Sequence, residues 1–286
     1  MESFIFGAIK PYNSTIMKKT TLLAYCFLLV TAFSFNSCDT ENIDPAVVDN
    51  NVNPDPEGGV STGDYWPMTL NNQWVYKRNG VIQEPMKIIG TETINGNLYY
   101  KFDNFAMIQA EIEEGEEAAE SIVHVRKNNG NYYTRSVMVA EVPEFGIPNF
   151  EMPAPVPFEY IILKDYAAVG QTWSEQISQN IDIVLPEGLP IAELHLVSTV
   201  RAQTMIVGKD IAISVNNVNY TDVIKVRVVY TGTVTGLPAG FPTPPPVVVT
   251  NYCWFAKNHG PIKMQTEAVP QMSQEYNSEL ISHVIN

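Results

Sequence analysis

The alternation of apolar and polar residues is the feature that most constrains how this chain folds. Every second residue of Ile224–Tyr230 is apolar, and Lys225 and Arg227 fall between them. A period of two places the apolar side chains on one face of a β-strand and the polar ones on the other. The same period returns in Ile211–Val215, after an expected turn at Gly208–Asp210. The pattern therefore predicts strands with one buried and one solvated face.

Short turn signals connect these strand-like segments. Asn95–Gly96 separates two of them, and Asn128–Asn131 separates Ile122–Arg126 from Tyr132–Ser136. Such connections are typical of β-hairpins, whereas parallel strands need crossover helices. The chain has 20 Pro and 17 Gly, and long runs of helix-forming residues are scarce. We therefore expect an all-β domain built as an antiparallel meander.

Both ends of the expected domain resemble a known family. Tyr65–Tyr76, which reads YWPMTLNNQWVY, resembles the opening of uncharacterised Bacteroidetes lipoproteins, which begin with an aromatic residue, Pro-Leu, a Gly-Asn pair and Trp-x-Tyr. Tyr252–Lys263 resembles their closing strand, with departures at Asn71, where the pattern has Gly, and at Asn258, His259 and Pro261. The resemblance implies a strongly curved antiparallel sheet or partial barrel, similar to lipoprotein-carrier or lipocalin-like folds. It implies no activity.

A secretory signal precedes this domain. Met17-Lys18-Lys19 is followed by the apolar run Leu22–Phe35 and then by Ser37 and Cys38. The run has fourteen residues, too few to cross a ~30 Å hydrocarbon layer as a helix. The ending resembles the lipobox of bacterial lipoproteins, in which the chain is cut before the Cys and that Cys is acylated. Residues 1–37 are thus predicted as a signal segment, and Cys38 as the site of lipidation.

Two alternatives concern this segment. The first is an ordinary secretory signal with an incidental Cys near its end. The second concerns residues 1–16, which have no role in the signal: either translation begins at Met17, or Met1 starts a signal with a long polar extension.

Residues 38–63 are predicted to be an acidic disordered tether. Seven acids and no Lys or Arg lie between Asp39 and Asp64, and Pro and Gly interrupt any period. Asp39 and Glu41, close behind Cys38, resemble the export signal of surface lipoproteins in the Bacteroidetes. We place the β domain at residues 64–270 and a C-terminal tail at residues 271–286.

Net charge and cysteine content limit which partners and which cellular compartment are expected for this protein. Asp and Glu number 31 against 17 Lys and Arg, for a net charge of -14, so binding of nucleic acid through its phosphates is not expected. Of the three Cys, Cys26 leaves with the signal and Cys38 would carry lipid. Cys253 is then the one thiol of the mature chain, without an internal disulfide.

Catalysis has no support in the sequence. The chain carries no nucleophile elbow, phosphate-binding loop, dinucleotide fingerprint or zincin motif, so we expect neither an enzyme nor a cofactor. The four His are too scattered to indicate a metal site by spacing, although a fold could gather them. Cys253 and His259 are a weak candidate for a thiol and base pair, because Cys253 lies in an apolar strand. The acidic run Glu111–Glu120 reads as a solvated loop rather than a Ca²⁺ site.

Two sets of residues are candidates for ligand contact. Trp66 and Trp254 could stack on sugar rings, or could pack in the core. Apolar side chains in three proline-rich loops could form a binding rim at one end of the sheet, or could fold back over an open sheet face. The rim candidates are Phe145, Phe150, Leu189, Leu237 and Phe241.

The expected function is that of a lipid-anchored cell-envelope lipoprotein in the outer membrane, facing the periplasm or the surface. Its β domain would bind or scaffold an unknown protein, lipid or glycan and would not catalyse. Two alternatives are a carrier of a lipid or apolar ligand inside the curved sheet and a glycan-binding accessory protein. A filled sheet interior would exclude the carrier, and two exposed coplanar Trp would favour the glycan binder.

Overall fold

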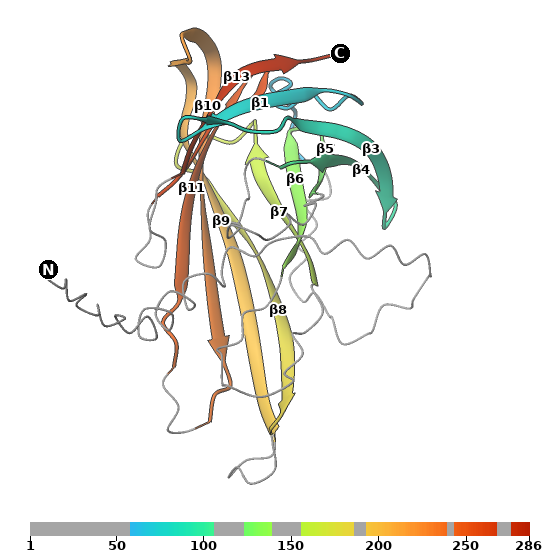
Figure 1. Ribbon diagram of the computed structural model, residues 1–286, viewed down its shortest axis with the longest axis vertical. Coiled ribbons are helices and arrows are strands. Elements are labelled where there is room, and N and C mark those ends of the chain that lie inside the picture. Colours follow the sequence, from blue (N-terminus) through green and yellow to red (C-terminus); the bar gives the residue numbers. More distant parts are fainter. Residues whose placement is uncertain (1–57, 106–122, 139–155, 186–192, 239–242, 268–275) are drawn as a thin grey trace, which may run out of the picture.

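The computed structural model describes residues 58–105, 123–138, 156–185, 193–238, 243–267 and 276–286. All regular structure in these residues is β-strand, and the strands form one antiparallel sheet. No segment in the described part is a helix that could span a membrane. Figure 1 shows the sheet curving round upon itself, nearly into a barrel. The predicted all-β fold with a strongly curved antiparallel sheet is therefore confirmed.

Thirteen strands make up the sheet. Their bounds are β1 Gln73–Arg78, β2 Val81–Ile82, β3 Met86–Ile94, β4 Asn97–Asp103, β5 Val123–Asn128, β6 Asn131–Met138, β7 Val156–Lys164, β8 Thr172–Val184, β9 Glu193–Val215, β10 Val218–Thr235, β11 Val247–Ala256, β12 Gly260–Thr266 and β13 Tyr276–Val284.

The strand order is that of two meanders that meet in the middle of the sheet. One run goes from β1 through β3 to β7, and the other goes from β8 to β13. Within each run neighbouring strands are consecutive in the chain, except that the short β2 lies between β1 and β3 in sequence and pairs only with β1. The runs are joined by β1 and β13, which pair from Gln73 opposite Val284 to Arg78 opposite Ser278. At the other side, β7 and β8 share no strand ladder within the described residues. We call this unpaired boundary the seam.

The turns follow the predicted chemistry. Asn95 and Gly96 both have positive φ, of 49° and 80°, as a type I′ hairpin turn requires. The expected turn at Gly208–Asp210 is wrong, because β9 continues through it to Val215. Asp210 instead has a φ of 52° where the pairing of β9 with β10 shifts register, so the signal marks an irregularity inside a long strand.

The sheet interior in its upper part is filled with aromatic side chains. Trp66 lies on Phe102 and Phe255, with ring centroids 5.4 and 5.6 Å apart, and Trp74 lies 6.0 Å from Phe102. All four side chains are fully buried. Such rings contribute large buried apolar areas, and tilted or offset pairs stabilise each other further. This aromatic core occupies the interior of the upper part of the sheet.

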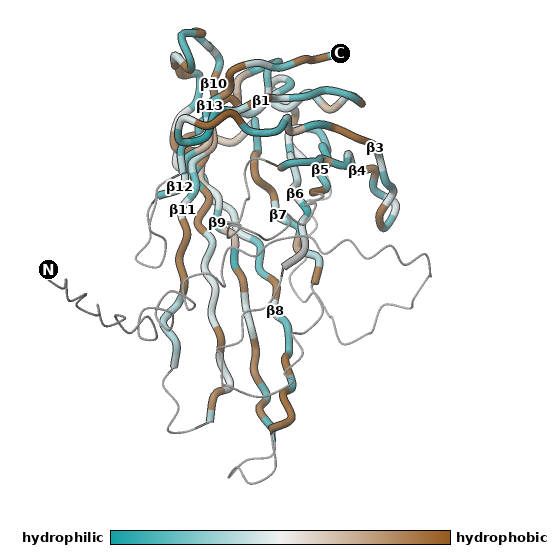
Figure 2. The backbone as a smooth tube through the Cα atoms, in the orientation of Figure 1, coloured by the Kyte–Doolittle hydropathy of each residue, from teal (hydrophilic) through white to brown (hydrophobic). Residues whose placement is uncertain are grey.

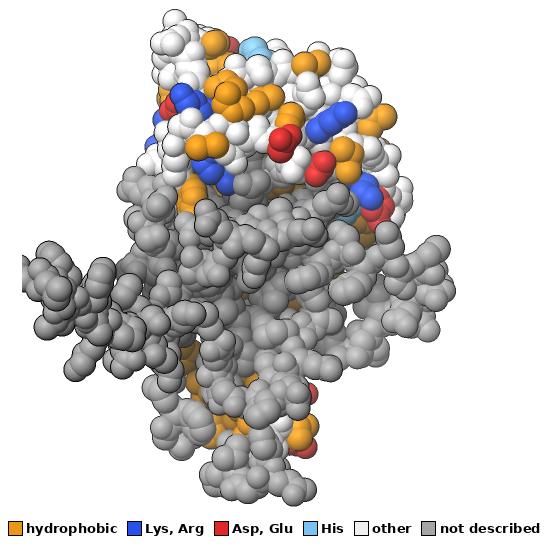
Figure 3. Space-filling model, viewed as in Figure 1, with side chains coloured by type: hydrophobic (Ala, Val, Ile, Leu, Met, Phe, Trp, Pro, Cys, Tyr) orange, Lys and Arg blue, Asp and Glu red, His pale blue; other side chains and the backbone are white. Residues whose placement is uncertain are grey.

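Below the core, the strands from β8 to β11 extend further than the others. Figure 1 shows β8, β9 and β11 running down past the ends of β6 and β7, and Figure 2 shows apolar residues recurring along them. A second, smaller apolar cluster lies on this extension, formed by Ile181, Ile183, Leu194 and Leu196. The face of the upper part shown in Figure 3 carries interspersed side chains of both charges.

Both predicted boundaries of the domain are corrected by the structure. Residues 276–284, expected in a tail, are β13 in the middle of the sheet, because the alternation in this segment buries Ser278 and Leu280 against the core. Asn286 also donates its backbone N–H to Asn72, over 2.9 Å. At the other end, residues 58–63, expected in the tether, are held to the domain by hydrogen bonds described below.

Leu280→Ala tests the place of β13 in the core. The side chain is buried, and truncating a buried Leu typically costs about 2–5 kcal/mol of unfolding free energy. The matched control is Val284→Ala on the same strand, where the side chain is about half exposed and the loss should be about 0.5 kcal/mol or less. Urea unfolding of the two variants measures both free energies of unfolding. Equal, small losses of stability would show that residues 276–284 are not part of the core and would support the predicted C-terminal tail.

Candidate functional site

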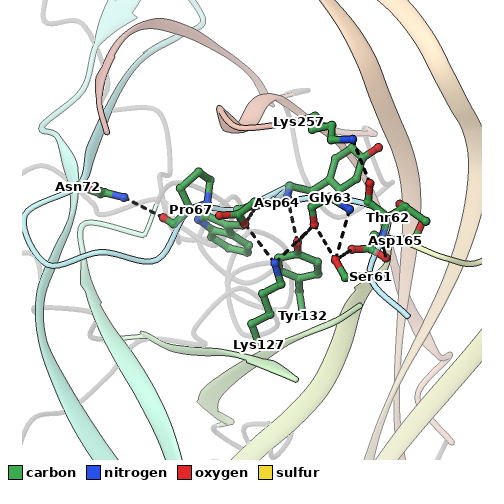
Figure 4. A network of polar contacts seen from close by, with 12 residues as sticks. Ser61, Thr62, Gly63, Asp64, Pro67, Asn72, Lys127, Tyr132, Asp165 and Lys257 are labelled. Atoms are coloured by element: carbon green, nitrogen blue, oxygen red, sulfur yellow. Dashed lines mark hydrogen bonds and ion pairs between the residues drawn. The ribbon is translucent and has the colours of Figure 1, made fainter. Parts of the chain in front are cut away.

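The chain enters the domain through a polar network around Asp165, at the end of the barrel where β7 leads into β8. The Asp165 carboxylate accepts hydrogen bonds from the Ser61 hydroxyl, over 2.6 Å, and from the Thr62 backbone N–H, over 3.0 Å. Asp165 is fully buried. Figure 4 shows Ser61, Thr62 and Gly63 gathered around this carboxylate. The network thus fixes the segment that follows the predicted tether.

Lysines and a tyrosine hold the same segment from other strands. Lys257 donates to the Thr62 carbonyl over 3.0 Å, and Lys127 lies 3.3 Å from the Asp64 carboxylate. Tyr132 accepts from the Tyr65 backbone N–H over 2.9 Å. The entering segment is therefore attached to three separate parts of the sheet. These groups are all engaged with the backbone or side chains of the entering segment, so we assign the network a structural role.

The seam is closed by side chains rather than by a strand ladder. The indole N–H of Trp173 donates to the Ile161 carbonyl over 2.7 Å, and the Thr204 hydroxyl donates to the same carbonyl over 3.2 Å. Tyr160 and Tyr230 share a hydrogen bond of 2.6 Å between their hydroxyls. Because side chains and not a strand ladder close the seam, polar groups lie on the otherwise apolar inner face of the sheet.

Glu175 lies beside these groups on the inner face. On β8 it stands opposite Ala202 of β9, which is paired in turn with Tyr230 of β10. A period of two therefore places all three side chains on the face that carries the core. The Oε2 atom of Glu175 is buried and has no hydrogen-bond partner among the described residues. A buried carboxylate oxygen without a donor is costly, and a native structure that keeps one gives it a candidate functional role.

Burial raises the pKa of Glu175 to about 7. A hydrogen bond from the Ile161 backbone and the nearby Lys164 act in the opposite direction, and the charge of Glu159 adds to the increase. Desolvation dominates because it penalises the charged form of a carboxyl group. Glu175 therefore changes charge near neutral pH.

The inner face below the seam alternates between apolar and polar rows. Continuing down the ladder from Glu175, Ile177 faces Val200 and Gln179 faces Ser198 before the apolar cluster of the extension begins. The polar groups thus form a band between the aromatic core above and the second apolar cluster below. This polar band, made of Glu175, Gln179, Ser198, Tyr160 and Tyr230, is the candidate functional site.

The tryptophans do not form the expected stacking platform. Trp66 and Trp254 are both buried, Trp66 among the aromatic core and Trp254 between the amine of Lys225, 4.5 Å from its ring, and that of Lys263, 5.8 Å away. Because neither offers a free ring face, the sugar-stacking hypothesis for these two residues is wrong. Trp74 is also buried, and Trp173 is occupied in sealing the seam.

Most of the predicted rim and the predicted lipidation site lie outside the described residues. These are Cys38, Phe145, Phe150, Leu189 and Phe241, and the acidic run Glu111–Glu120 also lies there. Leu237 is described, and it packs partly buried against the second apolar cluster. The position of Leu237 agrees with the alternative in which the proline-rich loops fold back over an open sheet face. The binding rim as a whole stays a prediction.

Other candidate groups are placed apart from the polar band. Cys253 is buried, and burial raises the pKa of its thiol well above the ordinary value, which is contrary to a nucleophilic role. No group of three or more His, Cys, Asp or Glu side chains in the described part could hold a metal ion. His259 and His283, distant in sequence, do come into contact, with 3.0 Å between Nδ1 of His259 and Nε2 of His283.

Comparisons with known proteins give fold neighbours only. No protein-family model matches the chain, and no curated protein matches it. Two solved structures, both described as putative, are similar: a lipoprotein from Parabacteroides distasonis and an exported protein with a YmcC-like fold from Bacteroides fragilis. The first has 12% identity and a TM-score of 0.39, covering 78% of this chain and 99% of its own. The second has 10% identity and a TM-score of 0.34, covering 77% and 98%.

At these values the neighbours carry no argument about function. The family resemblance of the opening motif therefore stays a prediction. The structure does explain one departure from that motif: Asn71, where the pattern has Gly, has a φ of 69°. Asn tolerates this left-handed conformation better than other residues with a side chain.

Glu175→Gln tests the buried carboxyl through the pH dependence of stability. The folded chain binds this proton more tightly than the unfolded chain, whose carboxyl has a pKa near 4.5. The free energy of unfolding of the wild type should therefore fall, by on the order of 3 kcal/mol, as the pH rises from about 4.5 to about 7. The Glu175→Gln variant should not show this decrease in the free energy of unfolding.

Glu84→Gln is the matched control, because Glu84 is exposed and lies away from the seam. It should keep the pH profile of the wild type. Chemical unfolding at a series of pH values measures all three proteins. A Glu175→Gln profile that coincides with the wild type would show that the carboxyl is solvated and would remove the polar band as a site.

Proposed function

We propose that this protein is a lipid-anchored, non-catalytic binding lipoprotein of the cell envelope, which takes an amphipathic ligand on the inner face of the β8–β11 extension. The observation that carries the proposal is the polar band at the seam, where the Glu175 Oε2 atom is buried and finds no hydrogen-bond partner in the described part of the chain. The proposed lipid anchor is inferred from the predicted signal segment and from Cys38, which follows it.

The filled upper part of the sheet limits where a ligand could lie. The aromatic core around Trp66 and Trp74 leaves no support for a carrier cavity there. The extension differs, because apolar rows alternate on its inner face with the polar groups of the band. A ligand with an apolar chain and one polar group matches that alternation, since protein sites for small molecules are mainly apolar with a few placed polar groups.

The free oxygen of Glu175 indicates the polar group of the ligand. A carboxylate accepts hydrogen bonds and cannot donate them, so its partner must be a donor such as an amine or a hydroxyl. An ammonium adds a charge-assisted bond, which is stronger than a neutral one. Tyr160 and Tyr230, joined by their hydroxyls, lie in the same band and supply further hydrogen-bonding groups. A long-chain amine or hydroxyl compound is the ligand class that these groups favour.

Calorimetric titration with decylamine and decanoic acid tests the binding. The two compounds share an alkyl chain and differ in the polar group. At pH 8, where Glu175 is mostly ionised, the amine should bind saturably and more tightly than the acid, by about tenfold or more. The preference should weaken at pH 6, where the carboxyl is mostly protonated.

The variants separate the proposed contact from general adsorption. Glu175→Gln should lose the preference for the amine, and Glu84→Gln should keep it. Equal amine binding by wild type and Glu175→Gln would contradict the role of the carboxylate. The absence of saturable binding by either compound would contradict a ligand site on this face.

Cys38→Ala tests the anchor independently. Without the acylated Cys, the protein should move from the membrane fraction to the soluble fraction of the native host, since a tether alone gives no membrane affinity. The measurement is immunoblotting after fractionation, with Cys253→Ala as the control that keeps Cys38. Retention of Cys38→Ala in the membrane fraction at the level of the wild type would rule out lipid anchoring through this residue.

A further inference from the structure

Two histidines that are distant in the sequence meet at one end of the sheet. His259 lies in the turn between β11 and β12, and His283 lies near the end of β13. Their facing nitrogens, Nδ1 of His259 and Nε2 of His283, are 3.0 Å apart, and their rings are inclined by 76°. Both side chains are partly buried. The pair takes no part in the polar band at the seam.

The backbone around His259 is fixed by contacts that do not involve its ring. The indole N–H of Trp74 donates to the His259 carbonyl over 2.6 Å, and Asn258 donates its N–H to the Asp64 carbonyl over 2.6 Å. Gly260 follows with a φ of +86°, and a Cβ there would lie 3.0 Å from the Trp74 indole nitrogen. The turn is therefore held tightly against β1.

His283 is positioned by the same tryptophan. It is the residue opposite Trp74 in the pairing of β13 with β1. On the other side, the ring of Tyr220 packs edge to face on His259, with centroids 5.2 Å apart. Two rings are thus held by three strands in one relative position, which is the preorganisation that a ligand site requires.

The separation of the two nitrogens suits a shared metal ion. With metal–nitrogen bonds of about 2.05 Å, nitrogens at this distance subtend about 95° at the metal. That angle is close to the right angle between neighbouring ligands in tetragonal or octahedral coordination, which Cu²⁺ and Ni²⁺ favour, and is smaller than the tetrahedral angle typical of Zn²⁺. The ring that now donates its N–H to the other would give up that proton on binding.

The surroundings of His259 and His283 favour the neutral form of both imidazoles. Burial lowers the pKa of His259, and burial together with the neighbouring His259 lowers the pKa of His283. Both shifts favour the neutral ring, which is the form in which imidazole binds metals. The net charge of -14 also attracts cations to the molecule.

We propose that His259 and His283 form a two-histidine site for a divalent transition-metal ion, with Cu²⁺ and Ni²⁺ bound more tightly than Zn²⁺ and with water completing the coordination. Two protein ligands give a weaker site than the three or four of structural and catalytic zinc centres. Such a site is suited to reversible occupancy rather than to holding the fold together.

Titration of the full chain with Ni²⁺ at pH 7.5, followed by calorimetry, tests the site. The wild type should bind one equivalent, and His259→Gln and His283→Gln should each weaken that binding by about tenfold or more. Loss of a group that only supports a metal ligand already costs about 10–100-fold, and here the ligand itself is lost. His195→Gln is the matched control, because His195 is exposed and lies near the far end of β9. It should bind as the wild type does.

Electron paramagnetic resonance of the Cu²⁺-loaded protein identifies the ligands. The wild-type spectrum should show two coordinated imidazole nitrogens, and either single variant should show one fewer. Thermal melts establish that the variants fold; His259→Gln keeps the carbonyl that Trp74 contacts, and His283 lies near the end of its strand. Unchanged nitrogen coupling in both variants, or Ni²⁺ binding equal to that of the wild type in both, would overturn the proposal.

Discussion

The pairing of β1 with β13 joins the two halves of the chain into one sheet. Each half of the chain forms a meander of neighbouring strands, and local hairpins suffice to build either one. In the part of the chain that the structure describes, only β1 and β13 join the halves by a ladder, and they lie about two hundred residues apart in the chain. Their union places Trp74 and Leu280 in one core and brings His283 to His259. Closing so long a loop costs entropy, and the buried aromatic core offsets that cost.

At the opposite boundary of the sheet, the two halves of the chain are held by side chains and not by a strand ladder. At the seam between β7 and β8, side chains of Trp173 and Thr204 replace the ladder and both donate to the Ile161 carbonyl. A ladder would have satisfied the backbone without bringing polar side chains inward. Its absence in the described residues leaves Glu175 partly buried, with a raised pKa and an unpartnered oxygen. The same irregularity that leaves the barrel unclosed therefore creates the polar band, and the proposed binding site follows from the closure geometry.

Much of the fold could be predicted from the sequence because its determinants are local. Alternation in Ile224–Tyr230 and the Asn95–Gly96 turn predict strands and hairpins, and the structure contains both. The end of the chain could not be assigned in this way. The alternation in Tyr276–Val284 shows which side chains can face a core, but it does not show that this segment pairs with β1. The candidate site was missed for a similar reason. Glu175 stands in an ordinary polar-apolar alternation, and only the register with Ala202 and Tyr230 shows that it faces inward. The tryptophans were a prominent signal in sequence, but burial assigns Trp66 and Trp254 to packing.

The pairing of β1 with β13 makes the two meanders one cooperative unit. Native-state amide hydrogen exchange of the full chain, read by peptide mass spectrometry, measures this most directly. Amides of Tyr276–Val284 that pair with β1 or β12 should exchange as slowly as those of β1 and β12, and with the same dependence on denaturant, because they open only when the whole domain unfolds. Rapid exchange of the β13 peptides beside slow exchange of β1 and β12 would contradict the account, since it would show two meanders that fold without the strand placed between them.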